Sequence, residues 1–138
     1  MSIRIADLNV GDALPERRHT PTNVSLFLYN ASVWNPHRIH YDETYTTQVE
    51  RHPAIVIDGP LQGDWLAQCV TNWLADDGML LRFNYSNRKA TYLGETLVSG
   101  GRITAIDARE KQVTVELYVK NAAGEVTSPG GGTVQLNG

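Results

Sequence analysis

The sequence has a single cysteine, Cys69, so the chain cannot form a disulfide within itself. Its four histidines and one cysteine lack the spacing of a structural zinc site, and we expect no metal centre. A lone thiol is typical of proteins kept in a reducing compartment. This feature predicts a cytoplasmic location.

Long apolar runs and a surplus of one charge sign are also missing. No stretch approaches the roughly 20 apolar residues that a membrane helix needs, and residues 1–7 lack the apolar core of a signal peptide. We therefore expect neither secretion nor membrane insertion. A net charge of -3 disfavours nucleic acid as a partner. A length of 138 residues with 41% hydrophobic content predicts one globular domain over residues 1–138.

Short elements separated by prolines are expected in the first half of the chain. Three are predicted: a turn that enters a short edge strand within residues 10–18, a helix capped by Thr22 or Asn23 that ends before residue 35, and a helix capped by Asp42 that runs through residue 49. Pro15 fits the strand because an edge strand need not donate every hydrogen bond. The apolar residues 55–57 then predict a short buried strand or bridge.

The longest helix is expected to begin at Asp58-Gly59-Pro60, because proline fits the first helical position, and to close at Asp76-Asp77-Gly78. Its apolar residues recur at spacings of three and four, which places them on one broad face. They are Leu61, Trp65, Leu66, Cys69, Val70, Trp73 and Leu74. The two tryptophans are expected to fill the hollow of a sheet rather than to bind a ligand.

Strands dominate the second half of the chain. Four are predicted, over residues 79–87, 92–107, 111–121 and 125–136, with a bulge at Gly100-Gly101. Only residues 128–132, Ser-Pro-Gly-Gly-Gly, are expected to be loose. The pattern predicts the α+β class and a single hot dog fold, in which a curved antiparallel sheet wraps a long central helix.

A polar segment rich in imidazole interrupts this pattern at residues 34–42, Trp-Asn-Pro-His-Arg-Ile-His-Tyr-Asp. Such a density of polar groups indicates an active-site loop. An imidazole with an ordinary pKa near ~6.5 exchanges protons at neutral pH, and positioned acid/base catalysis contributes about 10² to 10⁴ in rate. The alternative for His40 is a structural histidine hydrogen-bonded within the loop.

Several segments together carry a resemblance to a known family: 26–31, 35–42, 58–62, 83–88, and 94–97 followed by Gly101-Arg102. They resemble MaoC-like (R)-specific enoyl-CoA hydratases, and most of all the branch of hydroxyacyl-thioester dehydratases and mesaconyl-CoA hydratases. The resemblance implies reversible addition of water to a 2-enoyl thioester such as an acyl-CoA, without a cofactor. It also implies a dimer of hot dog domains, either a homodimer or a heterodimer with a related subunit.

The resemblance assigns the acid/base role to His40 and the oxyanion donor to Gly59. The chemistry agrees, because hydration needs a base for water, a proton for the α-carbon and a donor for the thioester oxygen. Backbone N–H groups at the start of a helix are unpaired and lie where the dipole favours negative charge. The wider family has aspartate five residues before the histidine, where this chain has Asn35. We expect Asn35, which cannot be a base, to orient the water or the histidine.

Four further residues are candidates for substrate binding: His37, Arg38, Arg88 and Lys89. Arg88 and Lys89 lie near a turn where they would meet a CoA phosphate, although exposed basic residues are common without any function. Two other functions stay open. The asparagine at position 35 favours a non-catalytic acyl-CoA-binding subunit. Asp58 and Asp64, near the helix, supply the carboxylate that a thioesterase would need.

Overall fold

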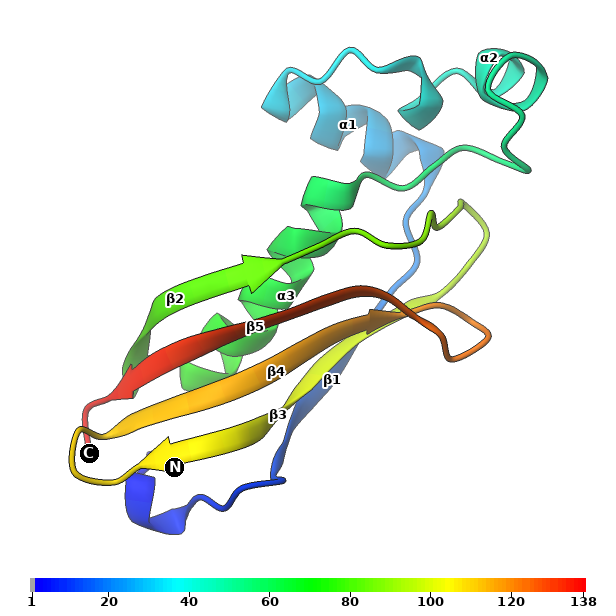
Figure 1. Ribbon diagram of the computed structural model, residues 1–138. Coiled ribbons are helices and arrows are strands. Elements are labelled where there is room, and N and C mark those ends of the chain that lie inside the picture. Colours follow the sequence, from blue (N-terminus) through cyan, green and yellow to red (C-terminus); the bar gives the residue numbers. More distant parts are fainter. Residues whose placement is uncertain (1) are drawn as a thin grey trace.

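The computed structural model describes residues 2–138, and its architecture is α+β, as the sequence predicts. Figure 1 shows a curved sheet with the helix α3 (Gly59–Leu74) lying along one of its faces. The strands follow the spatial order β1-β3-β4-β5-β2, and each neighbouring pair is antiparallel. They are β1 (Ala13–His19), β2 (Gly78–Tyr85), β3 (Leu97–Asp107), β4 (Gln112–Lys120) and β5 (Val126–Leu136).

Two shorter helices, α1 (Asn23–Val33) and α2 (Glu43–Gln48), lie beyond the N-terminal end of α3 (Figure 1). Thr22 caps α1, because its side chain accepts a hydrogen bond from the Ser25 N–H at 3.1 Å. In return, the Ser25 hydroxyl accepts a hydrogen bond from the Thr22 N–H at 2.8 Å. Asp42 caps α2 through the Tyr45 N–H. Single 3-10 turns occupy Ile5–Asp7 and Arg38–His40. None of the helices in residues 2–138 has the length and apolarity that crossing a bilayer requires.

The core lies between α3 and the concave face of the sheet. Leu66, Val70 and Leu74 of α3 are at most 1% exposed. Every second residue of β4 is buried as well, so one face of this strand packs on the core and the other faces away from it. Trp65 is buried among these residues, and Trp73 packs against them while partly buried. Both tryptophans therefore belong to the core, as expected.

A glycine turn precedes each of two strands, and at the second of them the predicted start of the strand is wrong. The predicted turn into a short edge strand is confirmed, because residues 10–11 form a turn in which Gly11 adopts a φ of 96°, and the strand follows from Ala13. The strand expected from residue 92 begins at Leu97, after Gly94 adopts a φ of 98°. Tyr92 instead forms an isolated bridge with Val56, which confirms the predicted short strand or bridge at residues 55–57.

The bulge predicted at Gly100-Gly101 is also wrong. Both glycines pair in register with β4, and the irregularity lies across from them in β1, between Leu14 and Arg17. Pro15 falls within that irregular stretch, where its missing N–H costs no ladder bond. Gly100 is needed because a Cβ there would lie 2.5 Å from the Tyr118 hydroxyl, which donates to Glu16 at 2.8 Å.

The segment 128–132 is not loose, because it forms the middle of β5 and pairs with both β2 and β4. Its glycines allow neighbouring backbones to approach closely. A Cβ on Gly130 would lie 2.6 Å from the Asn84 carbonyl oxygen and 3.2 Å from Leu66 of α3. The missing side chains therefore make room for the central helix.

His19 at the end of β1 ties this edge strand to the core. Its ring stacks on Trp65 with centroids 4.1 Å apart and 5° between the planes. Its Nε2 lies 2.8 Å from the Ser99 hydroxyl on β3. Burial, with a smaller contribution from the charge of Arg17, lowers the pKa of His19 to about 4.

This lowered pKa predicts a loss of stability in mild acid. In the unfolded chain a histidine titrates near about 6.5, so between that pH and about 4 the unfolded state binds more protons and the free energy of unfolding falls as pH falls. His19→Gln should lose less stability across this window than the wild type. Urea unfolding at about pH 7 and about pH 4.5 measures the difference. His37→Gln, at an exposed position, is the matched control. An acid sensitivity unchanged by His19→Gln would contradict the assignment.

Candidate active site

The loop that carries His40 is held against the segment leading into α3. Pro36 follows the end of α1, and the turn Arg38–His40 then brings the chain back toward residues 55–57. Two hydrogen bonds fasten the two segments: the Val56 N–H donates to the Ile39 carbonyl at 3.0 Å, and His40 Nδ1 lies 2.7 Å from the Val56 carbonyl oxygen. The position of the imidazole is therefore fixed by the backbone of Val56, which binds both the ring and the residue before it.

The surroundings of His40 fix its hydrogen positions. His40 is 7% exposed. Because a carbonyl oxygen only accepts hydrogen bonds, Nδ1 carries the hydrogen that is donated to Val56. The other nitrogen, Nε2, is not bound by the backbone and lies 3.5 Å from Asp58 Oδ2. Nε2 is thus the nitrogen that is free to exchange a proton.

Asp58 is the residue that sequence reasoning missed as a neighbour of His40. Its carboxyl is fully buried and receives two side-chain amides: Asn30 Nδ2 at 3.0 Å to Oδ1 and Asn35 Nδ2 at 3.4 Å to Oδ2. Burial raises the pKa of the Asp58 carboxyl, while the hydrogen bond from Asn30 and the proximity of His40 oppose that rise. One feature of the sequence could have indicated this neighbour: a carboxyl, Asp58, stands at the start of α3, whereas the loop has an asparagine at position 35.

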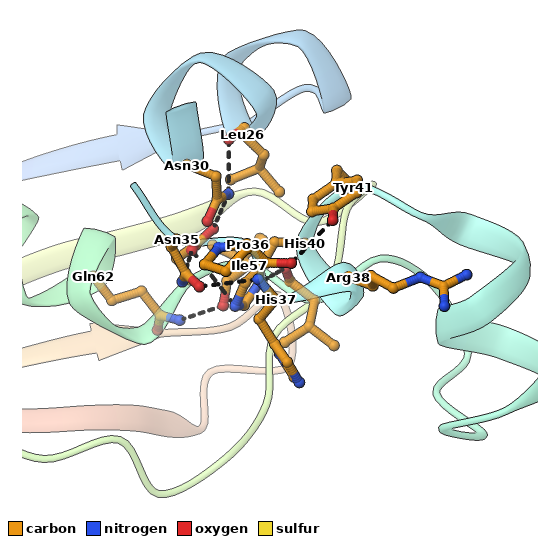
Figure 2. Close-up of polar contacts among 12 residues, drawn as sticks. Leu26, Asn30, Asn35, Pro36, His37, Arg38, His40, Tyr41, Ile57 and Gln62 are labelled. Atoms are coloured by element: carbon orange, nitrogen blue, oxygen red, sulfur yellow. Dashed lines mark hydrogen bonds and ion pairs between the residues drawn. The ribbon is translucent and has the colours of Figure 1, made fainter. Parts of the chain in front are cut away.

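Asn35 has a different contact from the one expected. Its Oδ1 accepts a hydrogen bond from the His37 N–H at 3.1 Å, which turns its Nδ2 toward Asp58. Figure 2 shows the side chains of Asn30, Asn35 and His40 lying close to one another. Asn35 therefore reaches His40 through Asp58 and has no direct hydrogen bond to the imidazole among the contacts of residues 2–138.

A pocket of about 360 Å³ brings most of the predicted site residues together. Gly59 lies at the first position of α3, where the N–H has no partner within the helix. The amide of Asn87 lies directly over Gly59 and accepts a hydrogen bond from Ser128 at 3.0 Å. Polar and basic groups in the lining are His40, Gly59, Gln62, Asn87, Arg88 and Lys89.

The two loop candidates for substrate binding lie outside this pocket. Arg38 forms an ion pair with Asp42 at 2.8 Å and lies over the ring of Tyr45, and Figure 2 shows it pointing away from His40. His37 is exposed, and its ring contacts that of His40 edge-on at 5.7 Å. Arg88 and Lys89 differ, because their backbone N–H groups donate to the Thr127 carbonyl oxygen and hold them at the pocket.

Metal ligands and a reactive thiol do not contribute to this site. Across residues 2–138, no three His, Cys, Asp or Glu side chains gather in a way that would hold a metal ion. Cys69 is buried in the core, and burial raises the pKa of its thiol. The groups that line the pocket, an imidazole, amides and basic side chains, are suited to proton transfer and to hydrogen bonding of an oxygen atom.

Sequence comparison identifies relatives of this chain. The family of hydroxyacyl-thioester dehydratase type 2 matches residues 8–93. The mitochondrial hydroxyacyl-thioester dehydratase type 2 of Saccharomyces cerevisiae is 28% identical over 108 residues, which cover 75% of this chain and 39% of that protein. The mesaconyl-C(4)-CoA hydratase of Chloroflexus aurantiacus is 42% identical over 52 residues, 38% of this chain and 18% of that protein. The chain thus spans well under half the length of these relatives.

Solved structures share the fold over nearly the whole chain. A MaoC-like dehydratase superposes with a TM-score of 0.89 at 20% identity, covering 99% of this chain and 43% of the other. The R-hydratase PhaJ1 of Pseudomonas aeruginosa gives 0.86 at 18%, covering 98% and 86%. The ChsH1-ChsH2 complex of Mycobacterium tuberculosis gives 0.82 at 16%, covering 94% and 98%. The hot dog fold expected from the sequence is confirmed.

The close contact between Gly59 and Asn87 predicts a coupled pair of substitutions. A Cβ on Gly59 would overlap the Asn87 amide, which would have to move away from Ser128. Gly59→Ala should therefore lower the free energy of unfolding by about 0.5–1.5 kcal/mol, the value of one hydrogen bond. In an Asn87→Ala background the same change should cost little. A double-mutant cycle by urea unfolding measures this coupling, and strictly additive costs would contradict it.

Proposed function

The chain belongs to the hydroxyacyl-thioester dehydratase type 2 family, and we propose that it catalyses the reversible addition of water to a 2-enoyl thioester. It would act as an enoyl-CoA hydratase or, in reverse, as a 3-hydroxyacyl-thioester dehydratase. The observation that carries this proposal is one pocket lined by an imidazole, His40, and by the first backbone amide of α3, at Gly59. The names of the yeast and Chloroflexus relatives support the same reaction class.

In the hydration direction, His40 Nε2 takes a proton from water while the water oxygen bonds to C3 of the substrate. The electrons of the C2=C3 double bond move through C2 onto the thioester oxygen, which becomes an enolate oxygen. The N–H of Gly59 donates to that oxygen, at the helix end where the dipole favours negative charge. The imidazolium then returns the proton to C2, so that one water is added and the imidazole is regenerated.

Arg88 and Lys89 complete the proposed site as contacts for the CoA phosphates. Both lie on the segment after β2 and line the pocket of His40 and Gly59. Lys89 pairs with Glu125, and Arg88 makes a 3.4 Å contact to the Ser86 hydroxyl, which leaves its guanidinium exposed to a phosphate. We retain His37 and Arg38 as more remote substrate contacts, on the loop outside the pocket.

The two alternative functions receive less support. Membership of a dehydratase family favours hydration over thioester hydrolysis. The asparagine at position 35 supports a binding-only subunit less than it first suggests, because a carboxyl is present beside His40 at Asp58. We therefore retain the hydratase as the proposed activity.

We further propose that residues 1–138 act as one hot dog domain in a homodimer or in a heterodimer with a related subunit. A two-component complex is among the solved structures with this fold. Apolar side chains on the outer face of α1 and just beyond it are exposed beside the site, with Phe27 at 60% and Trp34 at 89%. A second subunit would cover them. The lone buried thiol supports a reducing compartment such as the cytoplasm, although the yeast relative is mitochondrial.

Removal of the imidazole tests the proposed activity. His40→Ala should lower kcat for hydration of a 2-enoyl-CoA by about 10² to 10⁴, because it removes the group that exchanges both protons. The measurement is the loss of the conjugated enoyl thioester absorbance across short, branched and dicarboxylic substrates. His52→Gln, which changes a histidine paired with Tyr92 outside the pocket, is the control. Equal rates for wild type and His40→Ala would end the proposal.

The CoA contact predicts a selective effect on binding. Arg88→Ala should raise KM for a CoA thioester about fivefold, since an exposed ion pair contributes about 1 kcal/mol. The corresponding pantetheine thioester lacks the CoA phosphates and should show no change. Arg109→Ala, at the exposed turn between β3 and β4, serves as the matched control. An equal effect of Arg88→Ala on both thioesters would exclude a phosphate contact.

A further inference from the structure

We propose that Asp58 is the carboxylate partner of His40, supplied from the start of α3 in place of the aspartate that the loop lacks at position 35. This inference rests on the proposed function and deepens it. Asp58 would act through the imidazole, as a positioning residue that stabilises the imidazolium formed when His40 takes a proton from water. The active state then has a neutral imidazole beside an ionised carboxyl.

The first support is the hydrogen-bond geometry of the imidazole. Nδ1 already donates to the Val56 carbonyl oxygen at 2.7 Å, so the proton gained during catalysis can enter only at Nε2. Asp58 Oδ2 lies 3.5 Å from Nε2, which is long for a hydrogen bond with a neutral ring. An imidazolium would draw the two atoms together, because an opposite charge at this distance favours the charged ring.

The second support is that both side-chain amides beside the Asp58 carboxyl act as donors. Asn30 Nδ2 uses both of its hydrogens, one for the Leu26 carbonyl at 2.8 Å and one for Asp58 Oδ1 at 3.0 Å. A flipped amide would set its oxygen against those two oxygens, so the orientation is fixed. Its own buried Oδ1 accepts no hydrogen bond within residues 2–138, an arrangement that destabilises the fold.

Asn35 completes the donor set from the loop side, with Nδ2 directed at Asp58 Oδ2. Two amide donors and an imidazole thus surround the two carboxyl oxygens. The two amide donors stabilise an ionised carboxylate and cannot accept the hydrogen of a carboxylic acid. The hydrogen bond from Asn30 to the ionised carboxylate offsets the cost of the unpaired Asn30 oxygen.

The other charged and titratable groups nearby do not take the place of Asp58. From α1, Tyr29 has its pKa raised to about 12, by burial first and then by Asp64 and Asp58, so it is neutral at neutral pH. His37 meets the His40 ring edge-on from the same loop. Arg88 and Lys89 line the pocket from the segment after β2. Among residues 2–138, Asp58 supplies the carboxylate within 4.0 Å of the His40 ring nitrogens.

The proton balance of the step is closed. Water loses one proton to Nε2, and its oxygen forms the bond to C3 while the double-bond electrons move to the thioester oxygen. In this intermediate the imidazolium faces the Asp58 carboxylate, and the enolate oxygen faces the Gly59 amide. Return of the proton from Nε2 to C2 restores the neutral imidazole and the ionised Asp58.

The test compares Asp58→Asn with a variant that moves the carboxylate, Asn35→Asp combined with Asp58→Asn. Asp58→Asn should lower kcat at least about 10-fold with little change in KM, because the imidazolium loses its counter-charge. Without the carboxylate the imidazolium loses its proton at lower pH, so the rising limb of the kcat profile should move to lower pH. The swapped variant should recover part of kcat and return the limb toward the wild-type pH.

A turnover-independent measurement separates this inference from the proposed function. The pH titration of the His40 ring ¹⁵N signals should move to lower pH in Asp58→Asn and return in the swapped variant. Asp76→Asn, beyond the end of α3, should leave both the titration and kcat unchanged. A purely structural Asp58 would lower kcat without moving either the limb or the ring titration, which would overturn the inference.

Failure of all forms to hydrate any enoyl thioester would overturn the proposed function, while the ring titration would still decide the pairing. If Asp58→Asn does not fold, the wild-type titration and the swapped variant carry the test. His40 in the wild type should then respond to two coupled ionisations, its own and that of Asp58. A single-step response in the wild type would overturn the pairing.

Discussion

The hydrogen bond between His40 Nδ1 and the Val56 carbonyl oxygen is the contact on which the whole site depends. It joins a loop that follows α1 to the short bridged segment that leads into α3. Because the same segment continues directly into Asp58 and Gly59, one bond sets the imidazole, the carboxyl and the helix amide in register with each other. The ring can rotate only if this bond breaks, so the Val56 carbonyl group fixes the direction in which Nε2 points.

The sheet and α3 give this arrangement a rigid base. The buried residues of α3 are packed against β4, and the glycines of β5 allow the neighbouring strand and the helix to come close. Gly59 repeats this theme at the site, because its lack of a side chain leaves room for the Asn87 amide. The polar groups of the pocket are therefore attached to close-packed elements rather than to a free loop.

Much of the fold could be predicted from the sequence, because periodicity reports which face of an element is buried. The apolar spacing of α3 indicated its buried face correctly. The glycine-rich part of β5 was misjudged, since glycine favours turns in isolation and only the packing reveals a need for close approach. Asp58 was missed for a related reason: no local pattern reports that Val56 folds back onto Ile39 and so brings Asp58 to His40. The roles of His40, Asn35 and Gly59 stay predictions.

The hydrogen bond between Asn35 and Asp58 also bears on how such a site can diverge. An amide facing a carboxyl is a complementary pair, whereas two carboxyls would repel and two amides would leave the imidazole without a counter-charge. Each position is therefore constrained by the identity of the other, although they lie on separate segments. Exchange of the two residue types would pass through an impaired intermediate, so descendants of this chain would tend to keep the pair together or to change both members in close succession.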